Sequence, residues 1–164
     1  MTTEEILIDK DQLSAWLKEK RPVTILDIRP LKEREEWLIP GSIHANIYDK
    51  LKANDPTAFD GIELPDNQPI VTVCGGGKLS VMAAEKLQDK GYKALSLQGG
   101  MKAWNFAWNT AELKLNDTKI IQVRRSSKGC LSYIIGSGTH AIVIDASLDP
   151  QVYIDIAKDN GWII

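Results

Sequence analysis

The chain has 164 residues and a formal net charge of −2, with 43% hydrophobic and 26% charged residues. This length holds one domain with a good core, or one domain and part of another. The small net charge gives no electrostatic reason to expect nucleic acid or an anionic membrane surface as a partner.

Two further features restrict where the protein works. The first five residues are acidic and polar, unlike a secretory signal, and no apolar run approaches the ~20 residues that span a bilayer. The two cysteines, Cys74 and Cys130, do not make a disulfide framework. We therefore expect a cytoplasmic protein with no membrane partner.

The first hundred residues alternate short apolar runs with amphipathic stretches, as in an α/β domain. We predict strands at 6–8, 23–27, 43–47, 70–73 and 94–97. Helices are predicted at 10–18 with Asp9 as the cap, at 30–37, at 80–90, and from Gly99-Gly100 through Trp104 and Trp108. Prolines and polar residues make 53–69 a long surface connection. Strands separated by helices predict a mainly parallel sheet, with ligands at its carboxyl edge.

From about Leu113 the pattern changes to short strands joined by turns. Strands are predicted at 120–123, 130–135 and 141–144, with turns at 127–129 and 136–138, which is a β-meander. Pro150 begins a helix through about Asn160, and Ile163-Ile164 look like the start of another strand. We expect one domain at 1–112 and an incomplete, truncated second domain at 113–164.

The most informative site is the cysteine that follows the 70–73 strand. Three glycines let the backbone turn several N–H groups toward one point, and the next helix adds unpaired N–H groups and positive potential. Lys78 supplies a full charge, and Ser80 is a candidate N-cap. These features favour a thiolate or another anion at Cys74. The alternative is a buried, inert thiol followed by a simple turn.

Four strings together resemble the rhodanese (single-domain sulfurtransferase) family across residues 1 to about 110. They are LDIR at 26–29, IPGSIHA at 39–45, VCGGGKLS at 73–80 and LQGGMKAW at 97–104. The resemblance implies that Cys74 takes up a sulfane sulfur as a persulfide and passes it to a thiol or other acceptor. It also implies a substrate-binding loop, whose residues we take as Gly75, Gly76, Gly77, Lys78, Leu79 and Ser80.

The length of the cysteine loop distinguishes a sulfurtransferase from the related cysteine-based phosphatases. Cys74 to Leu79 is six residues, the length associated with sulfur transfer in this family. The related phosphatases use a longer loop that ends in arginine, because a phosphate dianion needs a wider ring and a bidentate cation. A cysteine-based phosphatase or arsenate reductase is therefore disfavoured. A module that binds persulfide for regulation, without efficient turnover, remains an alternative.

The loop also departs from the family pattern. Many rhodaneses carry arginine where Leu79 stands, and arginine or another polar residue where Gly75 stands. Lys78 is the only charge in this loop, and lysine is a flexible point charge. We therefore expect weak recognition of thiosulfate and a preference for a larger persulfide donor.

Residues 114–164 resemble a different family. The strings IQVRR at 121–125, GCLSYIIG at 129–136 and AIVIDA at 141–146 are similar to the opening strands of a metallo-β-lactamase-fold hydrolase. The nearest branch is that of persulfide dioxygenases and glyoxalases. The resemblance implies that a longer protein would bind iron or zinc through a histidine cluster beyond Ile164, and that this chain needs no cofactor. An apolar strand face without the rest of that domain predicts a homodimer, or disorder, in 114–164.

Several other side chains have a structural and a functional interpretation. Asp27 and Arg29 either contact substrate or form an ion-pair network at the strand-to-helix turn, and we favour the network. Glu33 lies in a charged segment that reads as a solvated helix face. His44, Trp104, Trp108 and Cys130 are each assigned to structure rather than chemistry.

Overall fold

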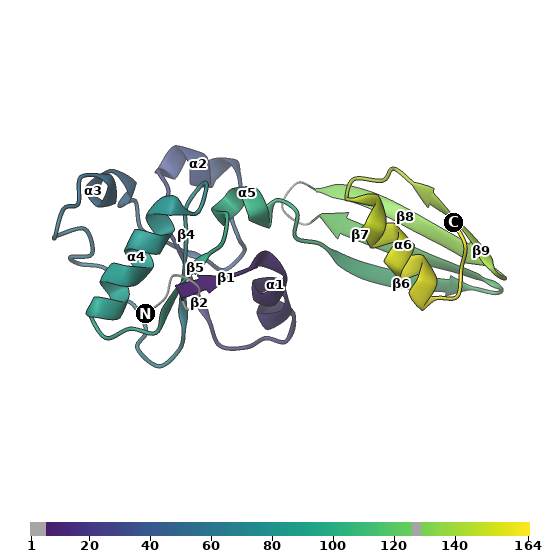
Figure 1. The fold of residues 1–164 in the computed structure, drawn as a ribbon, viewed down its shortest axis with the longest axis horizontal. Helices are drawn as coiled ribbons and strands as arrows, with labels where there is room; N and C mark the ends of the chain where they lie inside the picture. Colours follow the sequence, from purple (N-terminus) through teal and green to yellow (C-terminus); the bar gives the residue numbers. More distant parts are fainter. Residues whose placement is uncertain (1–5, 126–128) are drawn as a thin grey trace. The chain divides into compact units, whose positions relative to one another are not determined.

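The computed structural model describes residues 6–125 and 129–164 (Figure 1). The chain divides into two compact units, Met1–Trp104 and Asn105–Ile164, called here the first and the second unit. The boundary that we expect after residue 112 falls inside strand β6 (Asn109–Leu115), because this strand already pairs with the next one in the second unit.

The first unit is built on a five-stranded sheet in the order β1-β5-β4-β2-β3. Its strands are β1 (Leu7–Ile8), β2 (Thr24–Asp27), β3 (Ile43–His44), β4 (Ile70–Val73) and β5 (Ala94–Leu97). All neighbours are parallel, so the predicted parallel sheet is confirmed. Every residue of β2 and β4 is buried, as expected for strands with both faces covered.

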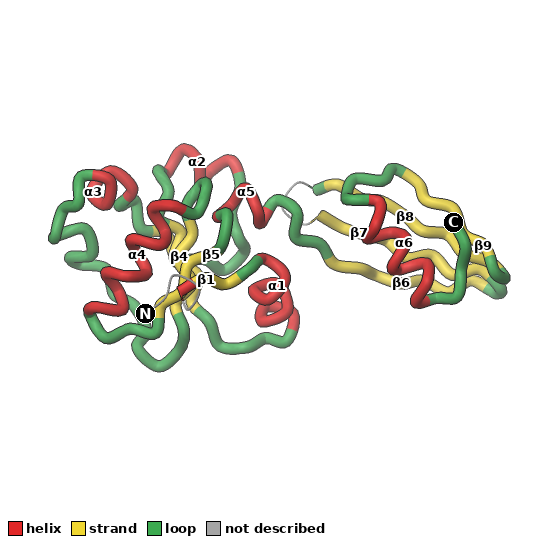
Figure 2. Tube along the Cα trace, in the orientation of Figure 1, coloured by secondary structure: helices red, strands yellow, loops and turns green. Residues whose placement is uncertain are grey.

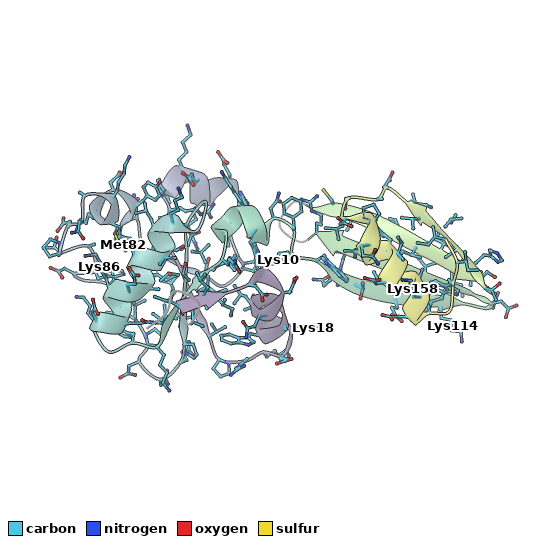
Figure 3. All side chains as sticks on the ribbon, in the orientation of Figure 1. Lys10, Lys18, Met82, Lys86, Lys114 and Lys158 are labelled. Carbon is cyan, nitrogen blue, oxygen red and sulfur yellow. The ribbon has the colours of Figure 1, made fainter. Side chains whose placement is uncertain are left out.

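Five helices surround this sheet, with α4 and α1 on opposite sides (Figure 1). They are α1 (Lys10–Lys18), α2 (Leu31–Glu36), α3 (Tyr48–Lys52), α4 (Lys78–Asp89) and α5 (Gly100–Trp104). The predicted cap is present, because Asp9 Oδ1 accepts from the N–H groups of Asp11 and Gln12 at 2.8 and 2.7 Å. Helix α4 turns its small residues Ala83 and Ala84 toward the core, and Met82 and Lys86 share another side (Figure 3).

Three predictions for the first unit need correction. Helix α3 was missed, since its five residues carry no capping side chain, and Leu51 holds it by complete burial. Segment 53–69 is more than a surface connection, because Ala58 and Phe59 pack in the hydrophobic core. The last helix ends at Trp104, and Trp108 packs instead against the core of the second unit.

The second unit is an antiparallel sheet in the order β6-β7-β8-β9, with one helix, α6, over one face (Figures 1 and 2). The remaining elements are β7 (Thr118–Arg125), β8 (Cys130–Ser137), β9 (His140–Ile144) and α6 (Pro150–Asp159). The predicted meander and helix are present, with the second turn shifted to Gly138 and Thr139. Ser127 and Lys128 of the other predicted turn lie outside the described residues.

Sequence reasoning missed β6, because its solvent-facing residues weaken the apolar signal of a strand. At the other end of the unit, Ile163 forms a parallel bridge with His140, where we expect a strand to begin. The described part of 114–164 therefore consists of strands and one helix.

Tyr153 joins α6 to the sheet. Its buried hydroxyl donates to Ser132 Oγ at 2.9 Å and accepts from the N–H groups of Ser147 and Leu148 at 2.8 and 3.2 Å. Burial raises the pKa of Tyr153, but these hydrogen bonds outweigh it and leave the pKa below its ordinary value. The hydroxyl thus satisfies two backbone donors at the start of the connection to α6.

The sheet face opposite α6 is apolar and uncovered, and we call it the open face. A row of aliphatic side chains crosses it in register, namely Leu113, Ile120, Ile135 and Ile142. Leu113 and Ile142, at the two ends of the row, are 54% and 59% exposed. In the part of the chain that the structure describes, no helix is long and apolar enough to cross a membrane.

Candidate active site

The cysteine loop begins where central strand β4 ends and closes at the first turn of α4. Cys74 is 3% exposed, and its Sγ accepts a hydrogen bond from the Gly77 N–H at 3.2 Å. Gly77 has a φ of +91°, a left-handed conformation in which a side chain would be strained. A Cβ there would also lie 2.8 Å from Gly99 N. Glycine at this position therefore lets the loop fold back onto its own sulfur.

Ser80 is not the N-cap that the sequence suggests. Helix α4 already begins at Lys78, and its N-cap is Gly77, which has no side chain to accept a bond. Ser80 is instead fully buried beside the thiol, with its Oγ 3.4 Å from Cys74 Sγ. Its hydroxyl donates to Gly77 O at 3.1 Å and accepts from Ser96 Oγ at 2.9 Å. Two hydroxyl groups therefore lie behind the sulfur.

Ser96 was missed, although the sequence carries a signal for it. It is a polar residue within the apolar run of β5, and β5 pairs with β4 beside the cysteine. Its side chain is completely buried, so its hydroxyl must find a partner inside the protein. The bond to Ser80 fulfils this need and fixes the serine that contacts Cys74.

Gly99 and Gly100, at the start of α5, allow this helix to hold the cysteine loop. The N–H groups at the start of α5 donate to the loop carbonyls, Met101 to Cys74 O at 2.8 Å and Lys102 to Gly75 O at 3.1 Å. A Cβ on Gly100 would overlap Cys74 O. In a trans peptide the C=O and the next N–H point in opposite directions. The N–H groups of Gly75 and Gly76 therefore point away from α5.

The other predicted loop residues differ in placement. Gly76 and Lys78 are exposed, and Lys78 forms no ion pair with any residue that the structure describes. Leu79 is half-buried and packs against the hydrophobic core. Leu79 thus anchors the first turn of α4 to the core of the first unit.

One acidic residue reaches the loop from outside it. Glu33 of α2 places Oε2 3.6 Å from the position that a Cβ on Gly75 would occupy. Sequence reasoning assigned Glu33 to a solvated face, since nothing in a run of alternating charges shows which carboxylate borders the loop. Its own side chain is exposed.

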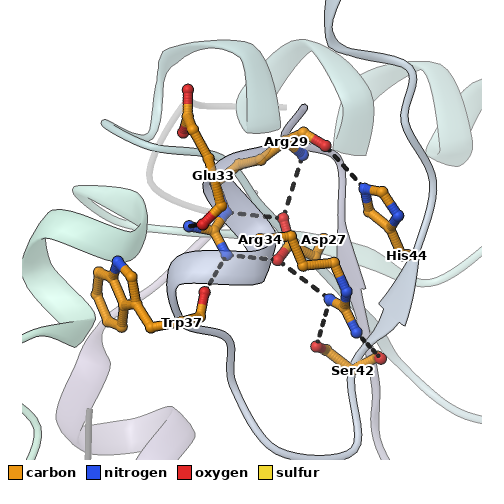
Figure 4. Close-up of polar contacts among 7 residues, drawn as sticks. All are labelled: Asp27, Arg29, Glu33, Arg34, Trp37, Ser42 and His44. Carbon is orange, nitrogen blue, oxygen red and sulfur yellow. Dashed lines mark hydrogen bonds and ion pairs between the residues drawn. The ribbon is translucent and has the colours of Figure 1, made fainter. Parts of the chain in front are cut away.

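Asp27 and Arg29 form a buried network at the end of β2 (Figure 4). Arg29 binds Asp27 through two bonds, Nε to Oδ1 at 2.9 Å and NH2 to Oδ2 at 2.7 Å. Arg34 adds a bond to Asp27 Oδ2 at 3.2 Å, and His44 Nε2 donates to Arg29 O at 2.8 Å. Asp27 and Arg29 are 1% and 2% exposed, so they meet protein groups and not solvent.

Burial raises the pKa of Asp27, but its partners outweigh this effect. Hydrogen bonds from the Arg29 side chain and backbone, with the positive charges of Arg29 and Arg34, bring the pKa below its ordinary value of 3.8. Arg29 also donates to the carbonyls of Glu33 and Trp37 at 3.3 and 2.8 Å. The network therefore ties the end of β2 to both ends of α2.

The arrangement can stabilise a sulfur anion. A thiol at the carboxyl edge of a parallel sheet accepts a hydrogen bond from the Gly77 N–H and lies at the N-terminus of a twelve-residue helix. Among the described residues, no group of three or more His, Cys, Asp or Glu side chains could hold a metal ion.

Comparison with known proteins places this cysteine-centred α/β domain in a family. The family model for the rhodanese-like domain matches residues 9–107, and the chain belongs to that family. The thiosulfate sulfurtransferase GlpE of Pseudoalteromonas translucida is 33% identical over 94 residues, which are 57% of this chain and 83% of that protein. A rhodanese-like domain protein from Staphylococcus aureus is 31% identical, with 60% of this chain and 89% of that chain covered and a TM-score of 0.49.

Other relatives are longer proteins with the same domain. A tRNA sulfurtransferase of Desulfurococcus amylolyticus is 35% identical over 77 residues, 47% of this chain and 14% of that protein. A putative sulfur carrier protein of Bacillus subtilis, YrkF, is 31% identical over 83 residues, 50% of this chain and 41% of that protein. The chain thus spans less than half the length of these two relatives.

We predict that Asp27→Asn destabilises the first unit by about 3–5 kcal/mol, because it leaves the Arg29 guanidinium buried without its counter-charge. The lowered pKa of Asp27 means that its contribution is complete above the unfolded pKa and is lost as the pH falls through the folded value. The wild type should therefore lose stability below about pH 4, and the variant should show a flatter acid limb.

Urea unfolding between pH 2 and pH 7, with hydrogen exchange of the β2 and β4 peptides, measures this loss. Glu36→Gln on exposed α2 is the control and should unfold like the wild type. Equal stability of Asp27→Asn and the control would contradict the prediction.

We predict that Gly100→Ala slows alkylation of Cys74 by iodoacetamide several-fold, since displacement of the loop carbonyl moves the N–H donors from the sulfur. Gly91→Ala is the matched control, because Gly91 also has a positive φ but has open space around it. Peptide mass spectrometry gives the rate at Cys74 separately from that at Cys130. Equal rates at Cys74 in the two variants would contradict the prediction, because the overlap at Gly100 would then have no effect of its own.

Proposed function

We propose that the protein is a sulfurtransferase that carries sulfane sulfur as a persulfide on Cys74 and passes it to a thiol. The observation that carries this proposal is the buried Cys74 Sγ, held at 3.2 Å from the Gly77 N–H inside a loop of backbone donors. Hydrogen bonds from backbone N–H groups favour a thiolate on Cys74 before transfer and a persulfide anion after it. The relatives named as sulfurtransferases support the same reading.

The reaction has two displacement steps that balance without an added oxidant. The Cys74 thiolate attacks the outer sulfur of the donor, an S–S bond forms, and the donor's S–S bond breaks. The leaving group departs with the electron pair, as sulfite from thiosulfate or as a thiolate from an organic persulfide. An acceptor thiolate then attacks the outer sulfur on Cys74, which regenerates the Cys74 thiolate and leaves a persulfide on the acceptor.

The donor follows from the charges of the loop. Lys78 is its only cation, and the position of Leu79 is occupied by an apolar side chain that packs on the core. No bidentate group therefore faces a small dianion. We propose a persulfide donor larger than thiosulfate and a small thiol or protein thiol as acceptor. Because the two cysteines form no disulfide, we also propose the reducing cytoplasm as the location.

For the second unit we propose that residues 113–164 form the opening part of a metallo-β-lactamase-fold hydrolase. The antiparallel sheet β6–β9 and the single helix on one face support this proposal. Residues 6–125 and 129–164 contain no cluster that fits a catalytic metal, so iron or zinc would need ligands from a longer chain, and no step of the proposed mechanism uses one. A His-x-His-x-Asp-His cluster encoded shortly after Ile164 would support the proposal, and its absence would overturn it.

We predict that a persulfide donor adds one sulfur atom to Cys74, because the loop donors stabilise the new persulfide anion. Intact-protein and peptide mass spectrometry detects the adduct, which Cys74→Ser abolishes and Cys130→Ser retains. Multiple turnovers to an added thiol separate a transferase from the alternative, a persulfide-binding regulatory module. Absence of the adduct with every donor would reject both, and phosphate release from an aryl phosphate would favour the phosphatase instead.

We predict a homodimer through the open face of the second unit. Arg124 supplies the only full charge among the paired positions of that face, so a second copy meets it without charge repulsion at its centre. Sedimentation velocity should show a dimer that Ile142→Lys dissociates. Lys114→Gln, which changes a side chain on the other face (Figure 3), should remain dimeric. A monodisperse wild-type monomer would contradict this prediction.

A further inference from the structure

The rim of the cysteine loop carries two opposite charges. Glu33 places Oε2 3.6 Å from the position of a Cβ on Gly75, and Lys78 is the first residue of α4. Both side chains are exposed, and neither forms an ion pair among the residues that the structure describes. The two side chains therefore bring one negative and one positive charge to the loop that holds Cys74.

The position of Glu33 is set by its backbone and not by its carboxylate. Arg29 NH1 donates to Glu33 O at 3.3 Å, and Glu33 N–H donates to Pro30 O at 3.1 Å. Arg29 is itself held by Asp27 in the buried network. Figure 4 shows the Glu33 carboxylate directed away from this network. A buried ion pair thus holds the residue, while its charge stays available to the loop.

We propose that Glu33 is a specificity-determining residue that selects against small anionic sulfur donors. The proposal rests on the sulfurtransferase function of Cys74 and names the donor class. A carboxylate at the rim repels an incoming anion in proportion to the charge of that anion. The free-energy penalty for a dianion such as thiosulfate is twice the penalty for a monoanion. An uncharged reagent is unaffected.

Three reagents of graded charge measure this field at Cys74. Iodoacetamide is neutral, iodoacetate is a monoanion of nearly the same shape, and thiosulfate is a dianion that loads one sulfur. Dividing each rate by the iodoacetamide rate of the same variant removes any change in the reactivity of the thiol itself. Peptide mass spectrometry reads all three reactions at Cys74, so the reading does not depend on turnover.

Glu33→Gln should raise the normalised iodoacetate rate about threefold and the normalised thiosulfate rate about tenfold, since the second factor is close to the square of the first. Both gains should shrink at 1 M salt, where the screening length falls to ~3 Å. Lys78→Gln should shift both rates in the opposite direction. Glutamine keeps the shape of Glu33 and the backbone carbonyl that Arg29 binds, and circular dichroism checks the fold.

The matched control is Glu36→Gln, which removes the same charge from the same exposed helix. Unchanged normalised rates in Glu33→Gln, or equal gains in Glu33→Gln and Glu36→Gln, would overturn the proposal. If the iodoacetate gain is present but no donor loads sulfur on Cys74, the field of Glu33 stands as a physical property. The sulfurtransferase function then fails, and with it the role of Glu33 in donor selection.

Discussion

The geometry of the site depends on how α5 holds the two peptide planes that contain the carbonyls of Cys74 and Gly75. The first N–H groups of α5 bind the carbonyl oxygens of Cys74 and Gly75, and this contact exists because Gly77, Gly99 and Gly100 let two backbones approach closely. Holding a carbonyl on one side of a trans peptide aims the next N–H to the other side. The orientation of the Gly75 and Gly76 N–H groups is therefore set by a helix that contributes no side chain to the loop.

The buried pair of Asp27 and Arg29 positions α2, the other helix that borders the cysteine loop. A buried ion pair adds little net stability, because the desolvation of both charges offsets their attraction. Here Arg29 also binds the carbonyls of Glu33 and Trp37, at the two ends of α2. Its clearest consequence is geometric, since it fixes a short helix that has no capping side chain of its own. Asp27 and Arg29 thus position α2, the helix whose Glu33 borders the loop.

The sequence predicts the parallel sheet and the position of Cys74, because buried strands such as 70–73 are continuous apolar runs. It does not predict Ser80 correctly, since the left-handed Gly77 starts the helix three residues earlier than a serine cap would. The polar Ser96 within an apolar strand signals a buried hydroxyl, but its partner Ser80, like the position of Glu33 beside the loop, depends on which elements lie side by side. The short helix α3 and the exposed strand β6 lack a clear hydrophobic period, so they were missed for a related reason.

Backbone donors and rim charges divide the task of recognition. An N–H group stabilises any sulfur anion that reaches it, whatever group carries that sulfur, so the loop itself selects for sulfur chemistry and not for a particular donor. Discrimination among donors must arise where they differ, in their charge and size outside the transferred atom. In this protein Glu33 and Lys78 border the part of the loop where the donor's outer groups would lie. The apolar Leu79 provides no bidentate hydrogen-bond donor of the kind that suits a dianion. The proposed selection of donors therefore rests on exposed side chains of α2 and α4, which can vary without disturbing the buried network of Asp27 and Arg29.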